Sequence, residues 1–321
     1  MKKVSNKLAV IIIAMLTISF GLFAVLGYSN SKDAILNISE DSKQMSSVSA
    51  NIYAQEFFGS RVFAVENFVK HLEENPYILE DKEELKEELL MATLAVNVAE
   101  FYVGFADNGE VYDAIVTPGK KTEVVHLTPQ KDNFDARTKV WYQKAMAKNG
   151  LIFTEPYIAQ TTGKRYITIT KPINIKGRNI GVVAADISLD DIGDNVAKMK
   201  DSDTGTIFIV GMDGAEMIYN PDKSAIMSQD NAVKNISREM IENFRKDSKS
   251  AFYFKNQNGI ERIGACELYP LPNWLICSSN SVSDYDSILN SVLTQQSMFS
   301  LLFIFIIVTV LVFAINYFLK P

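Results

Sequence analysis

Two long apolar runs enclose the rest of the chain. Residues 8–28 and residues 298–319 contain no charged side chain. Each run has roughly 20 residues, the length that an α-helix needs to cross a bilayer. Residues 29–297 between them mix polar and apolar positions in the way of a folded domain. The pattern predicts two transmembrane helices, 8–28 and 298–319, with one large module between them.

The charges beside the two runs predict how the chain lies in the membrane. Lys2, Lys3 and Lys7 precede the first run, and Lys320 follows the second. Short segments that carry lysine stay in the cytoplasm, so residues 1–7 and 320–321 are expected there. The first run is longer than the apolar part of a signal peptide, which favours an uncleaved anchor. We expect a multi-pass protein of the cell inner membrane with its module in the periplasm.

The module begins with helices and continues with strands. Apolar residues recur at helical spacing from Ser31 to Leu72 and predict a long helix that continues the first span outward. A second helix is predicted over 81–94, and a short one over 141–147. Between and after them lie β-rich runs with turn signals at Asn108-Gly109 and Lys176-Gly177, which predict antiparallel hairpins.

The order of elements occurs twice. A strand, an Asn-Gly or Asp-Gly turn, a second strand, a helix and a hairpin follow residue 97, and the same order follows Gly205. We therefore expect an α+β fold in which a long N-terminal helix carries two tandem antiparallel-sheet units. The predicted divisions of the module are helices over 29–96, a membrane-distal unit over 97–200 and a membrane-proximal unit over 201–297.

Composition excludes several classes of function. The net charge is −6, and no cluster of Lys and Arg indicates a nucleic-acid partner. The two histidines, His71 and His126, have no second ligand at metal-binding spacing, and no phosphate loop or nucleophile elbow is present. We expect no enzyme and no cofactor. Cys266 and Cys277 lie in successive strand-like segments, which leaves open a cross-strand disulfide or two buried thiols.

Five segments of the module carry a family resemblance. They are "FYVGFADNG", "RTKVWYQKA", "EPYIAQTTGKRYITITKPI", "GVVAADISLDDI" and "GTIFIVGMDGAEMIYNP". In this order they resemble the double Cache sensor module of bacterial methyl-accepting chemotaxis proteins. The resemblance implies two PAS-like units, ligand binding in the distal unit 97–200 and a homodimer with the long helices at the contact. It also implies a cytoplasmic chemotaxis signalling domain after residue 321, or a separate signalling protein.

The resemblance also implies ligand-binding positions. In amino-acid-binding members a Tyr precedes an Arg-x-Trp-Tyr segment, and a further Tyr and two Asp residues follow at fixed distances from the Trp. This chain matches the pattern at four positions: Trp141, Tyr142, Tyr157 and Asp186. It departs at three positions, with Phe134 in place of the first Tyr, Lys139 in place of the Arg and Ala159 in place of the middle Asp. Lys139 keeps a positive donor for a carboxylate but loses the bidentate fork of an arginine.

The same residues have plain structural interpretations. Lys139 and Trp141 lie two apart, so on an extended segment they would face one side and offer two donors to an anion, or they are a surface lysine beside a core tryptophan. Tyr142 and Tyr157 suit either a ligand or the core. Asp186 lies in an apolar run and needs a partner, either a ligand or a lysine such as Lys139 or Lys171.

These observations lead to one expected function with two rivals. We expect a transmembrane chemoreceptor sensor that binds a small carboxylate, either an organic acid or an amino acid, in its distal unit. Binding would send a conformational signal to a cytoplasmic chemotaxis output. The rivals are the sensor part of a histidine kinase or cyclase, and a membrane-tethered solute-binding module that does not signal.

Overall fold

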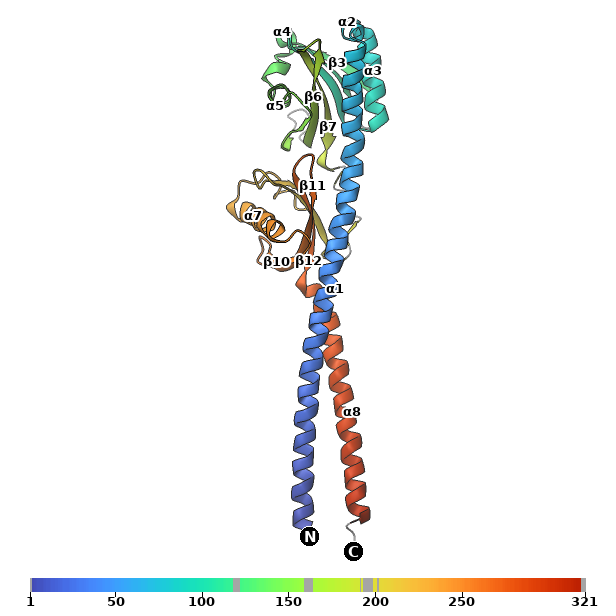
Figure 1. Cartoon of the computed structure of the whole chain (residues 1–321), viewed down its shortest axis with the longest axis vertical. Helices are drawn as coiled ribbons and strands as arrows, with labels where there is room; N and C mark the ends of the chain where they lie inside the picture. Colours follow the sequence, from blue (N-terminus) through green and yellow to red (C-terminus); the bar gives the residue numbers. More distant parts are fainter. Residues whose placement is uncertain are drawn as a thin grey trace.

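One helix runs along the whole molecule. The computed structural model describes residues 2–117, 122–158, 164–190, 192, 199–200 and 202–318. Helix α1 (Lys2–Glu74) joins the first apolar run to the predicted long helix without a break. Helix α8 (Asp286–Phe318) follows the 3₁₀ turn η3 (Val282–Tyr285) and returns beside the lower part of α1. Both ends of the chain therefore lie at one end of the molecule (Figure 1).

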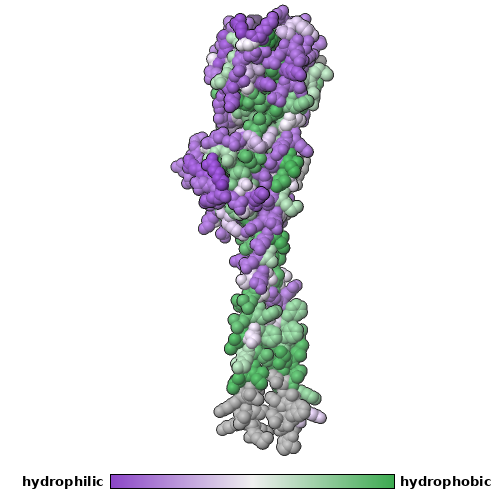
Figure 2. Space-filling model, viewed as in Figure 1, coloured by the Kyte–Doolittle hydropathy of each residue, from purple (hydrophilic) through white to green (hydrophobic). Residues whose placement is uncertain are grey.

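The lower parts of α1 and α8 are apolar on their outer surface. The most apolar stretches of the two helices have mean hydropathies of 2.3 and 1.9, and none of their residues is buried inside the protein. Figure 2 shows hydrophobic residues around this part of the helix pair, whereas the surface above it is mostly hydrophilic. Exposed apolar surface of this extent is unfavourable in water. The two runs are thus candidate membrane spans in the structure, as the sequence predicts.

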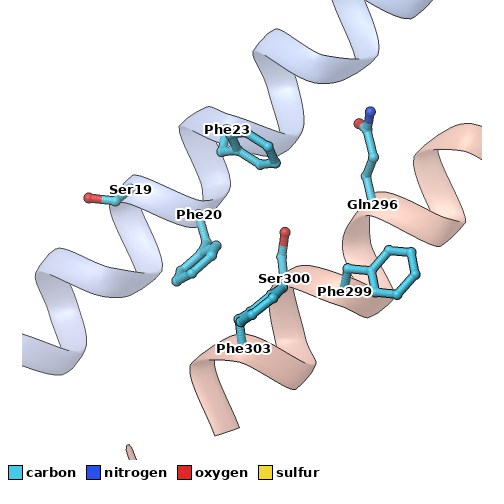
Figure 3. Close-up of a pocket in the computed structure, with 7 residues that line it drawn as sticks. All are labelled: Ser19, Phe20, Phe23, Gln296, Phe299, Ser300 and Phe303. Carbon is cyan, nitrogen blue, oxygen red and sulfur yellow. The ribbon is translucent and has the colours of Figure 1, made fainter. Parts of the chain in front are cut away.

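The two candidate spans contact one another around a cavity of about 470 Å³. Side chains from both helices line it: Ser19, Phe20, Phe23, Gln296, Phe299, Ser300 and Phe303 (Figure 3). The rings of Phe20 and Phe303 stack with their centres 6.1 Å apart. A Cβ atom on Gly27 would lie 2.8 Å from Nε2 of Gln296, so the end of the Gln296 side chain would have to move if Gly27 carried a side chain.

The first sheet follows two short helices, α2 (Tyr77–Glu80) and α3 (Lys82–Val96). Its strands are β1 (Glu100–Phe105), β2 (Val111–Ile115), β3 (Glu123–Leu127), β4 (Ile152–Phe153), β5 (Tyr157–Ile158), β6 (Arg165–Ile175) and β7 (Arg178–Ser188). They lie in the order β3-β2-β1-β7-β6-β4, and β5 also pairs with β6. The helices α4 (Pro129–Asp132) and α5 (Val140–Lys148) and the turn η1 (Ala136–Thr138) connect β3 to β4. The two predicted hairpins, β1–β2 and β6–β7, are confirmed.

The second sheet repeats this plan. Its strands are β8 (Thr206–Gly211), β9 (Met217–Tyr219), β10 (Phe252–Lys255), β11 (Glu261–Tyr269) and β12 (Trp274–Ser281), with helix α7 (Asn231–Lys246) between β9 and β10. The order β10-β11-β12-β8-β9 corresponds to β4-β6-β7-β1-β2 in the first sheet. Cys266 and Cys277 lie opposite one another and form a disulfide that joins β11 to β12. The expected mixture of antiparallel sheets and helices on a long N-terminal helix is confirmed. The sequence also predicts a helix over 190–198, and this segment lies mostly outside the described residues.

Each sheet lies between α1 and a shorter helix. Helix α5 covers the face of the first sheet that is turned away from α1, and α7 does the same on the second sheet (Figure 1). Phe58 of α1, Phe153 of β4 and Trp274 of β12 meet edge to face, with ring centres 5.7, 5.3 and 5.4 Å apart. These three rings connect both sheets to the long helix.

Candidate functional site

Polar side chains gather on the α5 face of the first sheet. Successive residues of a strand point to opposite faces. On β1, Phe101 therefore faces α1, where its ring lies 5.2 Å from that of Phe68, while Glu100 and Tyr102 face α5. Asp186 of β7 faces the same side, because it pairs directly with Glu100 in the strand register. The sheet thus presents acidic and hydroxyl groups beneath α5.

Asp186 is held by hydroxyl groups. Its side chain is only 4% exposed. The Tyr102 hydroxyl donates to it at 2.9 Å, the Thr168 hydroxyl at 2.7 Å, and the Tyr157 hydroxyl is a third donor. Neither of the lysines considered from the sequence pairs with it, since Lys171 lies 3.6 Å from Glu66 and Lys139 contacts an aromatic ring. Burial raises the pKa of Asp186, and the three hydroxyl donors oppose that rise.

Two more carboxyl groups lie beside Asp186. Asp113 of β2 pairs with Tyr102, and its side chain is 7% exposed. The buried Oδ1 of Asp113 has no hydrogen-bond partner, and neither Asp113 nor Glu100 pairs with a cation in the part of the chain that the structure describes. Burial, followed by the charge of Asp186, raises the pKa of Glu100 to about 7. Burial and then the charges of Glu100 and Asp186 raise the pKa of Asp113 well above its usual value.

Four residues of this face were not predicted from the sequence: Glu100, Tyr102, Asp113 and Thr168. Asp113 lies in the apolar run "VYDAIV", just as Asp186 lies in an apolar run of β7. An acidic residue within an apolar run indicates a buried carboxyl group, so this pattern could have identified Asp113 as well. Glu100 and Thr168 join the site only through the pairing of distant strands, which single-strand patterns do not contain.

Trp141 and Tyr142 lie in the first turn of α5. The ring of Trp141 meets that of Tyr102 edge to face, with centres 5.0 Å apart. A Cβ atom on Gly104 would lie 2.7 Å from the Trp141 ring. Because glycine has no side chain, the ring can pack directly against β1. Tyr142 is buried and its hydroxyl has no partner within the described residues. The expectation that Lys139 and Trp141 share an extended segment is wrong, because α5 begins between them at Val140.

Lys139 lies at the N-terminal end of α5 and is half-buried. Its Nζ is 4.1 Å from the centre of the Phe134 ring, a cation–π contact. Arg137 is held by Asp135 at 2.8 Å and by the carbonyl oxygen of Asp107 at 3.1 Å, so it makes structural contacts. Ala159 lies outside the described residues. Lys139 thus places a positive charge on Phe134 at the N-terminal end of the covering helix.

The side chains of this arrangement are hydrogen-bonding groups. Across the described ranges, no group of three or more His, Cys, Asp or Glu side chains is placed to hold a metal ion. The acidic side chains and the tyrosine and threonine hydroxyl oxygens can accept hydrogen bonds from an ammonium group. The lysine can donate to a carboxylate.

Most of the chain matches a known protein family. A family model described as "Cache domain" matches residues 30–291. The chain belongs to the Cache domain family. Among curated proteins it is similar to the methyl-accepting chemotaxis protein McpG of Pseudomonas putida, with 26% identity over 226 residues, 70% of this chain and 32% of McpG. The methyl-accepting chemotaxis protein PscA of Pseudomonas syringae pv. tomato is 32% identical over 109 residues, 34% of this chain and 17% of PscA. The chain thus spans about a third or less of these relatives.

Solved structures of Cache sensor domains share the fold. The ligand-binding domain of the Campylobacter jejuni chemoreceptor Tlp3, in complex with L-valine, matches with a TM-score of 0.58 and 22% identity over 81% of this chain and 97% of that one. The ligand-binding domain of the Pseudomonas aeruginosa amino acid chemoreceptor PctB, in complex with L-Arg, matches with a TM-score of 0.57 and 20% identity over 76% and 96%.

Proposed function

We propose that this chain is the sensor region of a membrane-bound chemoreceptor and that it binds a small amino acid on the α5 face of the first sheet. The observation that carries the proposal is the buried Asp186 with the unpartnered Asp113 beside it. Buried carboxylates without a cation are costly, so a cluster of them is a candidate functional site. The similarity to methyl-accepting chemotaxis proteins and the amino acids bound to Tlp3 and PctB support the proposal.

The acidic groups favour an amino acid over an organic acid. A ligand ammonium beside Asp186, Asp113 and Glu100 supplies the positive charge that their surroundings lack. A dicarboxylate would bring further negative charge to the same groups. The ligand carboxylate then accepts from Lys139, which rests on Phe134. Trp141, Tyr142 and Tyr157 enclose the ligand from α5 and β5, and Ala159 belongs to the site by family resemblance alone.

The proposed receptor keeps the membrane arrangement expected from its sequence. Residues 8–28 and 298–319 cross the inner membrane, and the module of residues 29–297 lies in the periplasm with helices over 29–96 and PAS-like units over 97–200 and 201–297. Residues 1–7 and 320–321 lie in the cytoplasm. Two copies pair along α1 in a homodimer. The output is a cytoplasmic chemotaxis signalling domain or a separate signalling protein.

A path for the signal follows from the packing. Tyr157 of the site lies on β5, and β4, which pairs with the same strand β6, carries Phe153 against Trp274 of the second sheet. Strand β12 continues through η3 into α8. A ligand shifts such a system by its differential affinity for two arrangements, and helix shifts of about 1–2 Å are sufficient in known switches.

The test is calorimetric titration of the full chain in lipid nanodiscs with amino acids and with their analogues that lack the amine. We expect an amino acid to bind and Asp186→Asn to weaken its binding at least tenfold, because the ammonium loses its charged acceptor. Lys139→Gln should weaken binding through the carboxylate end. Lys148→Gln, at the other end of α5, is the matched control and should bind like wild type.

Two results would contradict this proposal. One is amino-acid binding that is unchanged in Asp186→Asn. The other is an amine-free analogue whose binding depends on Asp186 as strongly as that of the amino acid. That result would mean that the site binds organic acids and does not recognise an amine.

A further inference from the structure

A second cavity lies in the unit nearer the candidate spans. It has a volume of about 200 Å³ and lies on the α7 face of the second sheet. This is the position that corresponds to the α5 face of the first sheet, because the two sheets share one strand order. Apolar side chains from the sheet and from α7, including Phe208, Met217, Met240 and Phe254, form much of its wall.

Arg262 of β11 brings a buried positive charge to this cavity. Its side chain is 8% exposed and lines the cavity beside Ser279. Its Nε donates to the Ser279 hydroxyl at 3.0 Å, and its Nη2 donates to the Thr206 hydroxyl at 3.0 Å and the carbonyl oxygen of Thr204 at 2.8 Å. These acceptors are all neutral. Ser279 and Thr206 also orient the guanidinium group within the sheet.

The charge of Arg262 has no direct counter-charge in the described part of the chain. No carboxylate oxygen there lies within 4 Å of its guanidinium group, and the bonds above leave Nη1 without an acceptor. Asp284 is an acidic neighbour whose charge opposes the lowering of the Arg262 pKa by burial. Burying a charge without a charged partner is unfavourable. An anionic group in the cavity would accept from the free donors of Arg262 and offset that cost.

We propose that this cavity binds a small monocarboxylate with a short apolar chain, independently of the amino-acid site in the first unit. The carboxylate accepts from Arg262, and the chain packs against Phe208, Met240 and Phe254. The volume suits roughly seven non-hydrogen atoms, taking about 30 Å³ for each as for a water molecule in the liquid. The ligand needs no amine, because Asp222, the acidic residue of the lining, already accepts from Ser224 and Gln257, both at 2.6 Å.

The segment around Asp222 also touches the first unit. The carbonyl oxygen of Lys223 accepts from Arg165 of β6 at 3.2 Å, and the Lys223 ammonium lies 2.8 Å from Asp190 after β7. A ligand that orders the wall of this cavity therefore acts on the contact between the units. A second ligand would thus influence the sensor at the contact between its two units.

The probe for this site is 3-methylbutanoate, observed by saturation-transfer NMR with the full chain in nanodiscs. We expect binding in wild type and in Asp186→Asn, which alters the other site only. Arg262→Met should weaken binding at least tenfold. The uncharged isostere 3-methylbutanamide should also bind at least tenfold more weakly than the acid, because it cannot pair with the guanidinium group.

A second variant separates loss of ligand contact from loss of folding. Val233→Phe adds a ring from α7 to the cavity without touching Arg262, and it should abolish binding in a protein whose melting temperature is close to that of wild type. The proposal is wrong if wild type does not bind 3-methylbutanoate, if Arg262→Met or Val233→Phe binds it normally, or if Asp186→Asn removes it. None of these results bears on amino-acid binding through Asp186.

Discussion

At the residue scale, the main feature is a group of three neighbouring carboxyls, Asp186, Asp113 and Glu100, that no cation pairs with in the described structure. Asp186 takes the hydroxyl hydrogen bonds, while Asp113 and Glu100 remain without them in the described structure. Negative charge on all three at once is unfavourable because they are close and poorly solvated. A cationic group placed beside these carboxyls would therefore be stabilised more than in water.

Glu100 provides a stability test of this picture. Its native pKa of about 7 exceeds the ordinary value of 4.5, so the native state binds the proton more tightly than the unfolded chain. The free energy of unfolding therefore falls as pH rises from about 4.5 to about 7, by roughly 3 kcal/mol. Glu100→Gln removes this loss, so the variant should be more stable than wild type at pH 8 and should lose the advantage near pH 4.5.

Chemical denaturation of the full chain in detergent micelles at these pH values measures the difference. Glu87→Gln, on the exposed surface of α3, controls for the loss of one carboxyl group. A difference between Glu100→Gln and wild type that does not change with pH would mean that Glu100 is not buried beside Asp186.

At the element scale, contact between the two sheets depends on aromatic rings. Strand β4 has only two residues, yet its Phe153 reaches both Phe58 of α1 and Trp274 of β12. Polar contacts also join the units, such as that of Arg165 with the carbonyl oxygen of Lys223. Edge-to-face rings have a preferred geometry, so a displacement of β4 is transmitted to β12 and α1.

A double-mutant cycle tests this contact. Phe153→Leu and Trp274→Leu, alone and together, should give a coupling energy of about 1 kcal/mol in the free energy of unfolding, because each ring loses its edge-to-face partner. Phe153→Leu with Phe208→Leu is the control pair, since Phe208 lies on the other face of the second sheet. Equal coupling in both pairs would show that the aromatic contact has no special role.

At the scale of the whole molecule, α1 and α8 connect both sheets to the candidate spans. Both helices reach the same end of the molecule, and their lower halves are covered with hydrophobic residues (Figures 1 and 2). Strand β12 leads into η3, where Asp284 accepts from the Thr204 hydroxyl at 2.7 Å, and then into α8. Movement of the second sheet therefore has a direct route into the second span.

The pairing of the spans can be tested in membranes. Phe20→Cys and Phe303→Cys replace two stacked rings, so mild oxidation should join α1 and α8 within one chain. Ile18→Cys with Phe303→Cys is the control, because Ile18 is 63% exposed and turned away from α8. Gel mobility before and after reduction distinguishes the products. Cross-links found only between two chains would mean that these rings meet across a dimer and not within one copy.

Much of the architecture was determined by the sequence itself. The two spans, the long helix, the hairpins at Asn108-Gly109 and Lys176-Gly177 and the duplicated order of strands follow from local patterns of apolar residues and turns. These patterns suffice because each reports a secondary structure formed by neighbours in the chain. The family resemblance specifies Trp141, Tyr142 and Asp186 by spacing, and the structure places the first two on α5 and Asp186 on the sheet face that α5 covers.

Only the tertiary structure decided which distant residues share a site. Strand register brings Glu100, Asp113 and Thr168 to Asp186, and it turns Arg262 toward a cavity beneath α7. A register shift of one residue would place each of these side chains on the opposite face. The register depends on pairing between strands that are as far apart in the sequence as β1 and β7. The charge balance of a site depends on all the side chains that pack around it. Neither the register nor the charge balance can be predicted from a single segment of the chain.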